Sequence, residues 1–102
     1  MPRRLFASIL YEAELADAQL LDELAHSIRS FAEDDEAGRA WSREHAYAGY
    51  TSYASLNDLP KRDPSFAELA KILTRHATRF AKECAFELAS KPRLDSLWVN
   101  LL

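Results

Sequence analysis

The chain has 102 residues, enough for one domain with a modest hydrophobic core. Hydrophobic residues make up 48% and charged residues 28%, a balance that argues against wholesale disorder. Two glycines, four prolines and one cysteine exclude collagen-like, linker and disulfide-framework classes. No apolar run approaches the roughly 20 residues of a membrane span, and the apolar start is too short for a signal peptide. We expect a single domain over residues 1–102, in the cytoplasm.

Acidic and basic residues are unevenly distributed, although the net charge is only −3. Between Leu5 and Gly38, nine acidic residues accompany a single basic one, Arg29. From Arg39 onward, ten basic residues accompany seven acidic ones. The overall charge therefore gives no general affinity for nucleic acid, but the asymmetry requires an explanation.

The first third of the chain predicts a short strand and a helix. Leu5–Tyr11 is apolar and flanked by aromatic residues, which is typical of a strand. Asp17 is a candidate N-cap for the helix. The apolar residues that follow at helical spacing are Leu20, Leu21, Leu24, Ile28 and Phe31. Because the acidic run Glu33–Glu36 opposes the dipole at a helix C-terminus, we expect the helix to fray or break there.

The middle of the chain, from Trp41 to Leu59, is rich in aromatic and hydroxyl side chains. Tyr50–Ser55 is typical of a strand or an extended segment. Asn57–Pro60 has the composition of a turn. We therefore expect extended structure between the two helices.

A long second helix follows. Asp63 is its expected N-cap, Pro64 suits the first helical position, and Ser65–Glu68 matches a capping box. Lys91–Pro92 is expected to end it, after about 25 residues. Its apolar stripe consists of Phe66, Leu69, Leu73, Phe80, Cys84 and Leu88. Cys84 is interpreted as a small core residue and not as a nucleophile.

The last residues, Leu97–Leu102, form a strand pattern interrupted only by Asn100. One interpretation is that this strand pairs with Leu5–Tyr11 and completes a small domain. The other is that a larger sheet continues from it, because an open apolar edge is unusual. Either way, we predict an α+β fold in which two main helices pack on a small, incomplete sheet of short strands.

No catalytic residue or metal ligand is predicted. Glu23 and His26 form one E-x-x-H pair, whereas a di-iron site needs two, so a solvated pair is expected. The histidines His26, His45 and His76 have neither the H-x-D or H-x-E pattern of an iron triad nor zinc-ligand spacing. His76 lies at the margin of the apolar stripe and is interpreted as a packing residue.

Four basic residues lie on one face of the second predicted helix: Lys71, Arg75, Arg79 and Lys82. We call them the basic ridge; such a ridge could follow a phosphate backbone. Alternatively, it faces the acidic first helix, or solvent with partners such as Glu68 and Glu83. The acidic N-terminal third supplies countercharge within the chain, which favours this alternative and makes nucleic acid an unexpected partner.

Several segments together resemble one protein family. They are Trp41, the stretch Gly49–Pro60 (GYTSYASLNDLP), Asp63–Phe66 (DPSF) and Leu97–Leu101 (LWVNL). They resemble the N-terminal part of bacterial Fe(II)/2-oxoglutarate-dependent oxygenases. The resemblance extends from about Leu5 to Leu102 and is densest between Trp41 and Phe66.

The resemblance implies that the W-V-N strand leads into a double-stranded β-helix, which holds the iron ligands and the basic anchor for 2-oxoglutarate. It implies Fe(II) and 2-oxoglutarate for the family, and neither for residues 1–102 alone. Trp98 and Asn100 would lie on the first barrel strand, where alternation points both the same way. By the resemblance, Asn100 reaches the 2-oxoglutarate pocket. The favoured alternative is that Asn100 satisfies a neighbouring backbone group.

Three functions follow as hypotheses. The first is the N-terminal portion of an Fe(II)/2-oxoglutarate dioxygenase, catalytically incomplete by itself, with the missing catalytic barrel as its partner. The second is a non-enzymatic interaction module that pairs through Leu97–Leu102 with another chain or with its own copy. The third is nucleic-acid binding through the basic ridge.

Overall fold

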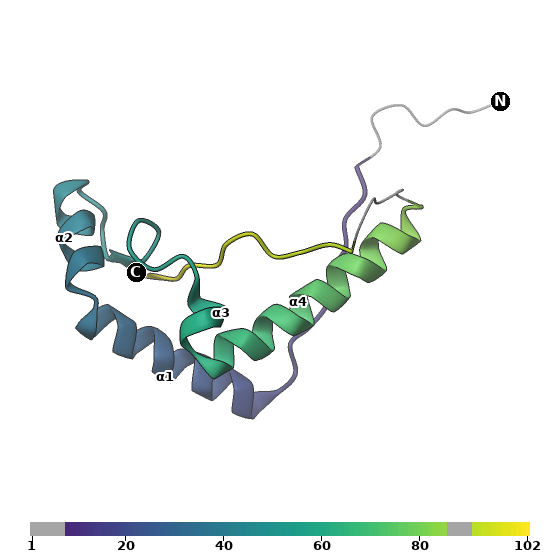
Figure 1. The fold of residues 1–102 in the computed structure, drawn as a ribbon, viewed down its shortest axis with the longest axis horizontal. Helices are drawn as coiled ribbons and strands as arrows, with labels where there is room; N and C mark the ends of the chain where they lie inside the picture. The colour runs from purple at the N-terminus through teal and green to yellow at the C-terminus, as the bar shows by residue number, and fades with distance from the viewer. Residues whose placement is uncertain (1–7, 86–90) are drawn as a thin grey trace.

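A computed structural model describes residues 8–85 and 91–102. Its elements are α1 (Ala18–Asp34), α2 (Glu36–Glu44), β1 (Tyr50–Thr51), α3 (Leu59–Arg62), α4 (Pro64–Glu83) and β2 (Asn100–Leu101). The long helices α1 and α4 form an open V, and the final segment returns from the far end of α4 toward α2 (Figure 1). There β2 pairs antiparallel with β1 in a two-stranded sheet. The predicted α+β fold with two main helices is confirmed.

The predicted helix starts are also confirmed. Asp17 caps α1 by accepting a hydrogen bond from the Leu20 N–H at 3.0 Å. Asp63 caps α4 by accepting from the Ser65 N–H at 2.8 Å, and Pro64 takes the first helical position. Both caps satisfy backbone donors that have no partner within the helix. The expected break in the acidic run occurs at Asp35, which ends α1 and caps α2.

The strands in the middle and at the end of the chain are shorter than predicted, and an additional helix precedes them. Trp41 lies in α2, a helix that the sequence did not predict. Within Tyr50–Ser55, only Tyr50–Thr51 is strand, because hydrogen bonds from Ser55 and Leu56 back to the Ser52 carbonyl close a turn. The final strand is likewise confined to Asn100–Leu101.

The predicted first strand is also not observed. Residues 8–11, the described part of Leu5–Tyr11, are not strand, and the earlier residues lie outside the described ranges. β2 pairs with β1 instead. The helix α4 ends at Glu83, earlier than predicted, because Ala85 takes a positive φ of 54° that a helix cannot continue through. Leu88 lies outside the described residues.

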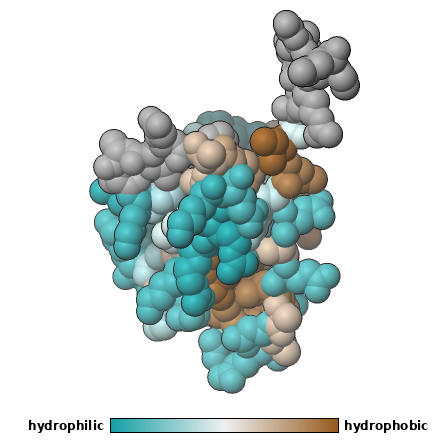
Figure 2. Space-filling view, turned by 90° about the vertical axis from the view of Figure 1, so that its right-hand side faces the viewer, coloured by the Kyte–Doolittle hydropathy of each residue, from teal (hydrophilic) through white to brown (hydrophobic). Residues whose placement is uncertain are grey.

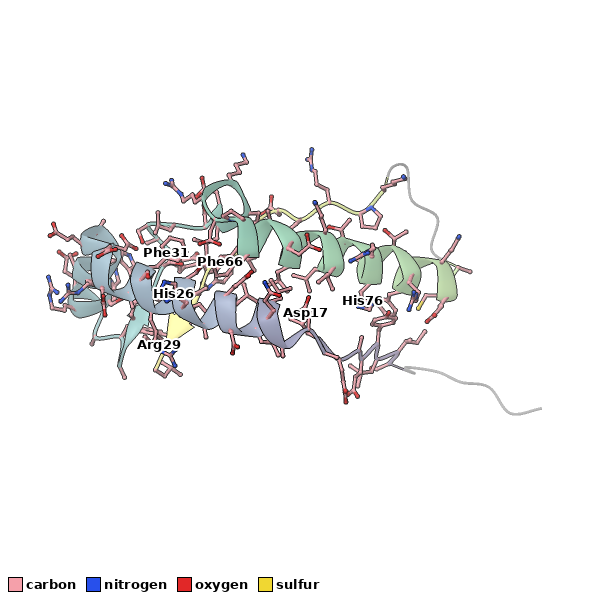
Figure 3. All side chains as sticks on the ribbon, turned by 90° about the horizontal axis from the view of Figure 1, so that it is seen from below. Asp17, His26, Arg29, Phe31, Phe66 and His76 are labelled. Atoms are coloured by element: carbon pink, nitrogen blue, oxygen red, sulfur yellow. The ribbon has the colours of Figure 1, made fainter. Side chains whose placement is uncertain are left out.

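The core lies where α1, α3 and the start of α4 meet the sheet. Its buried members are Leu20, Leu24, Tyr50, Leu59, Phe66 and Val99. The rings of Phe31 and Phe66 meet between α1 and α4, with centroids 6.0 Å apart (Figure 3). Farther along α4 the packing is thinner: Leu73 is 39% exposed, and Cys84 is half-buried.

Part of the surface is apolar. Ile9 and Leu10 are exposed, and hydrophobic atoms gather beside the grey N-terminal residues in Figure 2. None of the helices in the described ranges has both the length and the apolar character needed to cross a membrane.

Candidate functional site

The C-terminal strand is attached to the rest of the molecule by a pair of buried residues, Ser52 and Val99. Each backbone N–H donates to the other residue: Ser52 to the Val99 carbonyl and Val99 to the Ser52 hydroxyl, both at 3.0 Å. The Ser52 hydroxyl itself donates to the Leu56 carbonyl at 2.9 Å. Ser52 is fully buried and Val99 is 6% exposed, so water does not compete for these bonds. They fix the position of β2.

A second attachment lies just before the strand. The Leu97 N–H donates to the Asn57 carbonyl at 2.8 Å, and Leu97 forms a parallel bridge with Asp58. Gly49 allows β2 to come close, because a Cβ at this position would overlap the Leu101 carbonyl. The returning segment is thus held at Leu97 and again at β2.

The opposite edge of β2 is open. In the register, Ser52 and Val99 form a hydrogen-bonded pair, and Thr51 and Asn100 form the neighbouring pair. Antiparallel ladders alternate, so the backbone N–H and C=O of Asn100 point away from β1. Within residues 8–85 and 91–102 the sheet has no third strand. This edge can therefore accept another strand.

Aromatic rings from three separate segments form a row that ends at Trp98, just before β2. His45 stacks on Trp41 with centroids 4.0 Å apart, Trp41 contacts Tyr53 at 6.0 Å, and Tyr53 contacts Trp98 at 5.1 Å. We call these four residues the aromatic row. Tyr53 is 53% exposed and Trp98 is 40% exposed. Leu101 and Leu102 are exposed nearby, which makes this region a candidate docking surface.

The carboxylate of Asp35 connects β1 to the helices. One oxygen accepts from the Gly38 N–H at 3.0 Å, and the other accepts from Tyr50 Oη at 2.7 Å and Ser55 Oγ at 2.5 Å. Partial burial raises the pKa of Asp35, but the hydrogen bonds from Ser55, Tyr50 and Gly38 outweigh it and hold the pKa below its ordinary value. Burial and the adjacent carboxylate raise the pKa of Tyr50, so its hydroxyl stays a donor.

Asn100, the predicted 2-oxoglutarate contact, lies in β2 with an exposed side chain. Trp98 is also exposed, with buried Val99 between them, as expected from strand alternation. The Asn100 amide makes no hydrogen bond to any residue in the described ranges, so the alternative role of satisfying a neighbouring backbone group is not seen there. Its cofactor contact stays a prediction.

The histidines lie in three different places. His76 forms a hydrogen bond with Tyr11 Oη at 2.6 Å, and His45 belongs to the aromatic row. His26 lies on α1, well apart from His76 (Figure 3). His26 and Glu23 line a hollow of about 490 Å³ with Asp63, whose carboxylate accepts from Ser27 Oγ at 2.8 Å. Among the described residues, no three His, Cys, Asp or Glu side chains come together as a metal site. These residues do not fit an iron centre.

The basic ridge is exposed along α4. Its only ion pair among the described residues joins Lys71 to Glu68 at 3.9 Å, with both side chains more than half exposed. Neither Glu83 nor any acidic residue of α1 pairs with the ridge in the described ranges. The ridge thus faces solvent, and the countercharge expected from the first helix is not in contact with it.

Sequence reasoning missed two features of this region. It did not find that Asp35 joins the helices to β1, or that Ser52 bonds Val99 across the chain. The composition of the GYTSY stretch indicates extended structure, but it does not indicate which segment pairs with it. No protein-family model matches the chain, and no curated protein matches it significantly. Function is therefore inferred from the residues and their arrangement.

Proposed function

We propose that the chain is the N-terminal portion of an Fe(II)/2-oxoglutarate-dependent dioxygenase, and that β2 joins it to the catalytic barrel. The observation that carries the proposal is that β2 is bonded along one edge and open along the other. Buried bonds from Ser52 and Val99 fix one edge, while the other edge and the aromatic row are open. The two motifs of the resemblance, in Gly49–Pro60 and Leu97–Leu101, meet in space at this point.

Exposed apolar side chains beside β2 support the same function. Tyr53, Trp98, Leu101 and Leu102 would lie within an interface with the barrel. The barrel would cover these residues and extend the sheet from the open edge.

In this proposal the described residues supply support and no metal ligand, since they offer no cluster that fits iron. Iron and 2-oxoglutarate, held by the barrel, would supply the oxidant for an unactivated C–H bond. The contribution of this chain is to present Asn100 on a fixed strand, within reach of 2-oxoglutarate. A cytoplasmic location belongs to the same proposal.

The test begins with the DNA that follows the Leu102 codon. We expect a continuing frame with an H-x-D or H-x-H segment and a distal histidine. The product of that frame should form succinate from 2-oxoglutarate with Fe(II) and oxygen, and residues 1–102 alone should form none. Asn100→Ala should raise the KM for 2-oxoglutarate more than it lowers kcat. A stop codon followed by unrelated sequence, or a longer product without 2-oxoglutarate turnover, would refute the proposal.

The open edge also supports a second candidate, an interaction module that pairs β2 with its own copy. Asn100→Pro removes an N–H that faces the open edge and leaves the pairing with β1 intact. Asn100→Ala is the matched control, because it keeps that N–H. If β2 self-pairs, light scattering should show a dimer that Asn100→Pro disrupts and Asn100→Ala retains. A monomer at all concentrations would exclude this candidate.

A further inference from the structure

Two adjoining hollows follow the exposed side of α4. One of about 530 Å³ is lined by Lys71 and Arg75, and the next, of about 510 Å³, by Arg75, Arg79, Lys82 and Lys91. Both share Thr74 and Arg75, so together they form one shallow trough, which we call the basic groove. The end of the molecule at which α4 finishes is largely hydrophilic at its centre (Figure 2). We propose that the basic groove binds the phosphate backbone of duplex DNA.

The cations of the groove are free to bind an anion. Within the described ranges, Arg75, Arg79 and Lys82 have no acidic side chain within ion-pair distance. The single pair, between Lys71 and Glu68, is solvent-exposed and contributes little to stability. The acidic residues of α1 that lie near α4 line a different hollow, at its N-terminus. A ligand that neutralised the groove would therefore break no strong contact inside the chain.

The spacing of the cations matches a regular polyanion. At about 100° and 1.5 Å per residue, the four ridge side chains lie within about 80° of one another and extend along roughly 17 Å of α4. One DNA strand places a phosphate about every 3.4 Å along the duplex axis. About five phosphates thus lie opposite the ridge, enough for each cation to contact one.

The lining of the groove favours a duplex over a single strand. Proteins that bind single strands stack bases on aromatic side chains. The lining residues of the groove contain no aromatic ring; beside the cations they are threonine, alanine and Glu68. Contacts from Lys, Arg and Thr to phosphate oxygens require no exposed base. The same absence predicts binding without sequence preference.

The experiment is fluorescence anisotropy with a labelled 20-base-pair duplex and the unmodified chain. We expect binding in the micromolar range at 50 mM salt, with a slope of log K against log salt of about −3.6 for four phosphates. Between 50 and 200 mM salt, affinity should then fall about 150-fold. The double variant Arg75→Glu/Arg79→Glu should bind at least about tenfold more weakly, with the slope reduced to about −1.8.

The matched control is Arg39→Glu/Arg43→Glu, which makes the same charge change on exposed residues of α2. It should bind nearly as the parent does, and circular dichroism should show that both variants are folded. Absence of binding at 50 mM salt, or equal loss in both variants, would overturn the proposal. So would tighter binding to a single strand. A dimer in the parent that Arg75→Glu/Arg79→Glu dissociates would identify a second copy as the occupant instead.

Discussion

The two ends of the molecule are stabilised by different kinds of contact. The sheet end, residues 17–66 and 97–102, contains the core residues, the part-buried hydrogen bonds of Asp35 and the buried bonds between Ser52 and Val99. In the arm, the rest of α4 with residues 8–16 and 91–96, Ala81 is the one buried apolar residue among those described. Within the arm, Tyr11 holds residues 8–16 against α4, because it hydrogen-bonds His76 and contacts the Phe80 ring. Stability therefore resides in the sheet end, and the arm can carry exposed charge at little cost.

The largest expected effect is at the sheet end. Asp35→Ala removes the acceptor for Gly38, Tyr50 and Ser55 and leaves the Tyr50 hydroxyl without its partner. Since hydrogen bonds to a charged group contribute about 1.5–3 kcal/mol, we expect the free energy of unfolding to fall by about 3 kcal/mol in urea titrations. Asp34→Ala, on the exposed neighbour, should change it by less than about 0.5 kcal/mol. Equal losses in the two variants would show that Asp35 contributes no more to stability than its exposed neighbour.

Lowering the pH is expected to reduce the stability by a smaller amount. The pKa of Asp35 is lowered in the folded chain, so its contribution is complete above its ordinary pKa of 3.8 and is lost as pH falls through the lowered value. The pKa of Asp63 is lowered as well: burial raises it, but bonds from Ser65 and Ser27 outweigh that. Stability measured from pH 6 to pH 2 should decline below about pH 4. Asp35→Asn should flatten the decline; an unchanged profile would contradict this account.

The smallest effect is expected in the arm. Tyr11→Phe keeps the ring against Phe80 and removes only the hydroxyl that bonds His76. We expect a loss of about 0.5–1 kcal/mol in the free energy of unfolding. Tyr47→Phe is the control, because the Tyr47 hydroxyl has no hydrogen bond among the described residues. A loss as large as that of Asp35→Ala would remove the distinction between the arm and the sheet end.

The sequence predicted the features that depend on neighbouring residues. The caps Asp17 and Asp63 and the break near Asp35 follow from local chemistry, and all three are observed. The helix α2 was missed, because its glycine and tryptophan precede a stretch of β-formers and give no clear helical stripe. The end of α4 was missed because Ala85 adopts its positive φ without a glycine to signal it.

The candidate site was less predictable than the fold. The segments around Tyr50 and Asn100 were recognised as extended, but their pairing was not, because apolar alternation indicates a strand and not its partner. The hydroxyls of Ser42 and Ser52 accept hydrogen bonds from the backbone N–H groups of Thr51 and Val99. These bonds replace part of a longer ladder, which is why the strands are so short. Charge counts showed the asymmetry between the two parts of the chain. They did not show that, among the described residues, no acidic side chain of α1 forms an ion pair with the basic ridge.

The bond between Ser52 and Val99 has a consequence for synthesis of the chain. These residues are 47 positions apart, and α3 and α4 lie between them. A ribosome that adds about 5–20 residues per second incorporates Val99 roughly 2–9 seconds after Ser52. During that interval the Ser52 hydroxyl lacks its final partner and Leu59 lacks the cover of Val99. We expect the nascent chain to pass through a stage in which its helices have formed and its core is still open on one side.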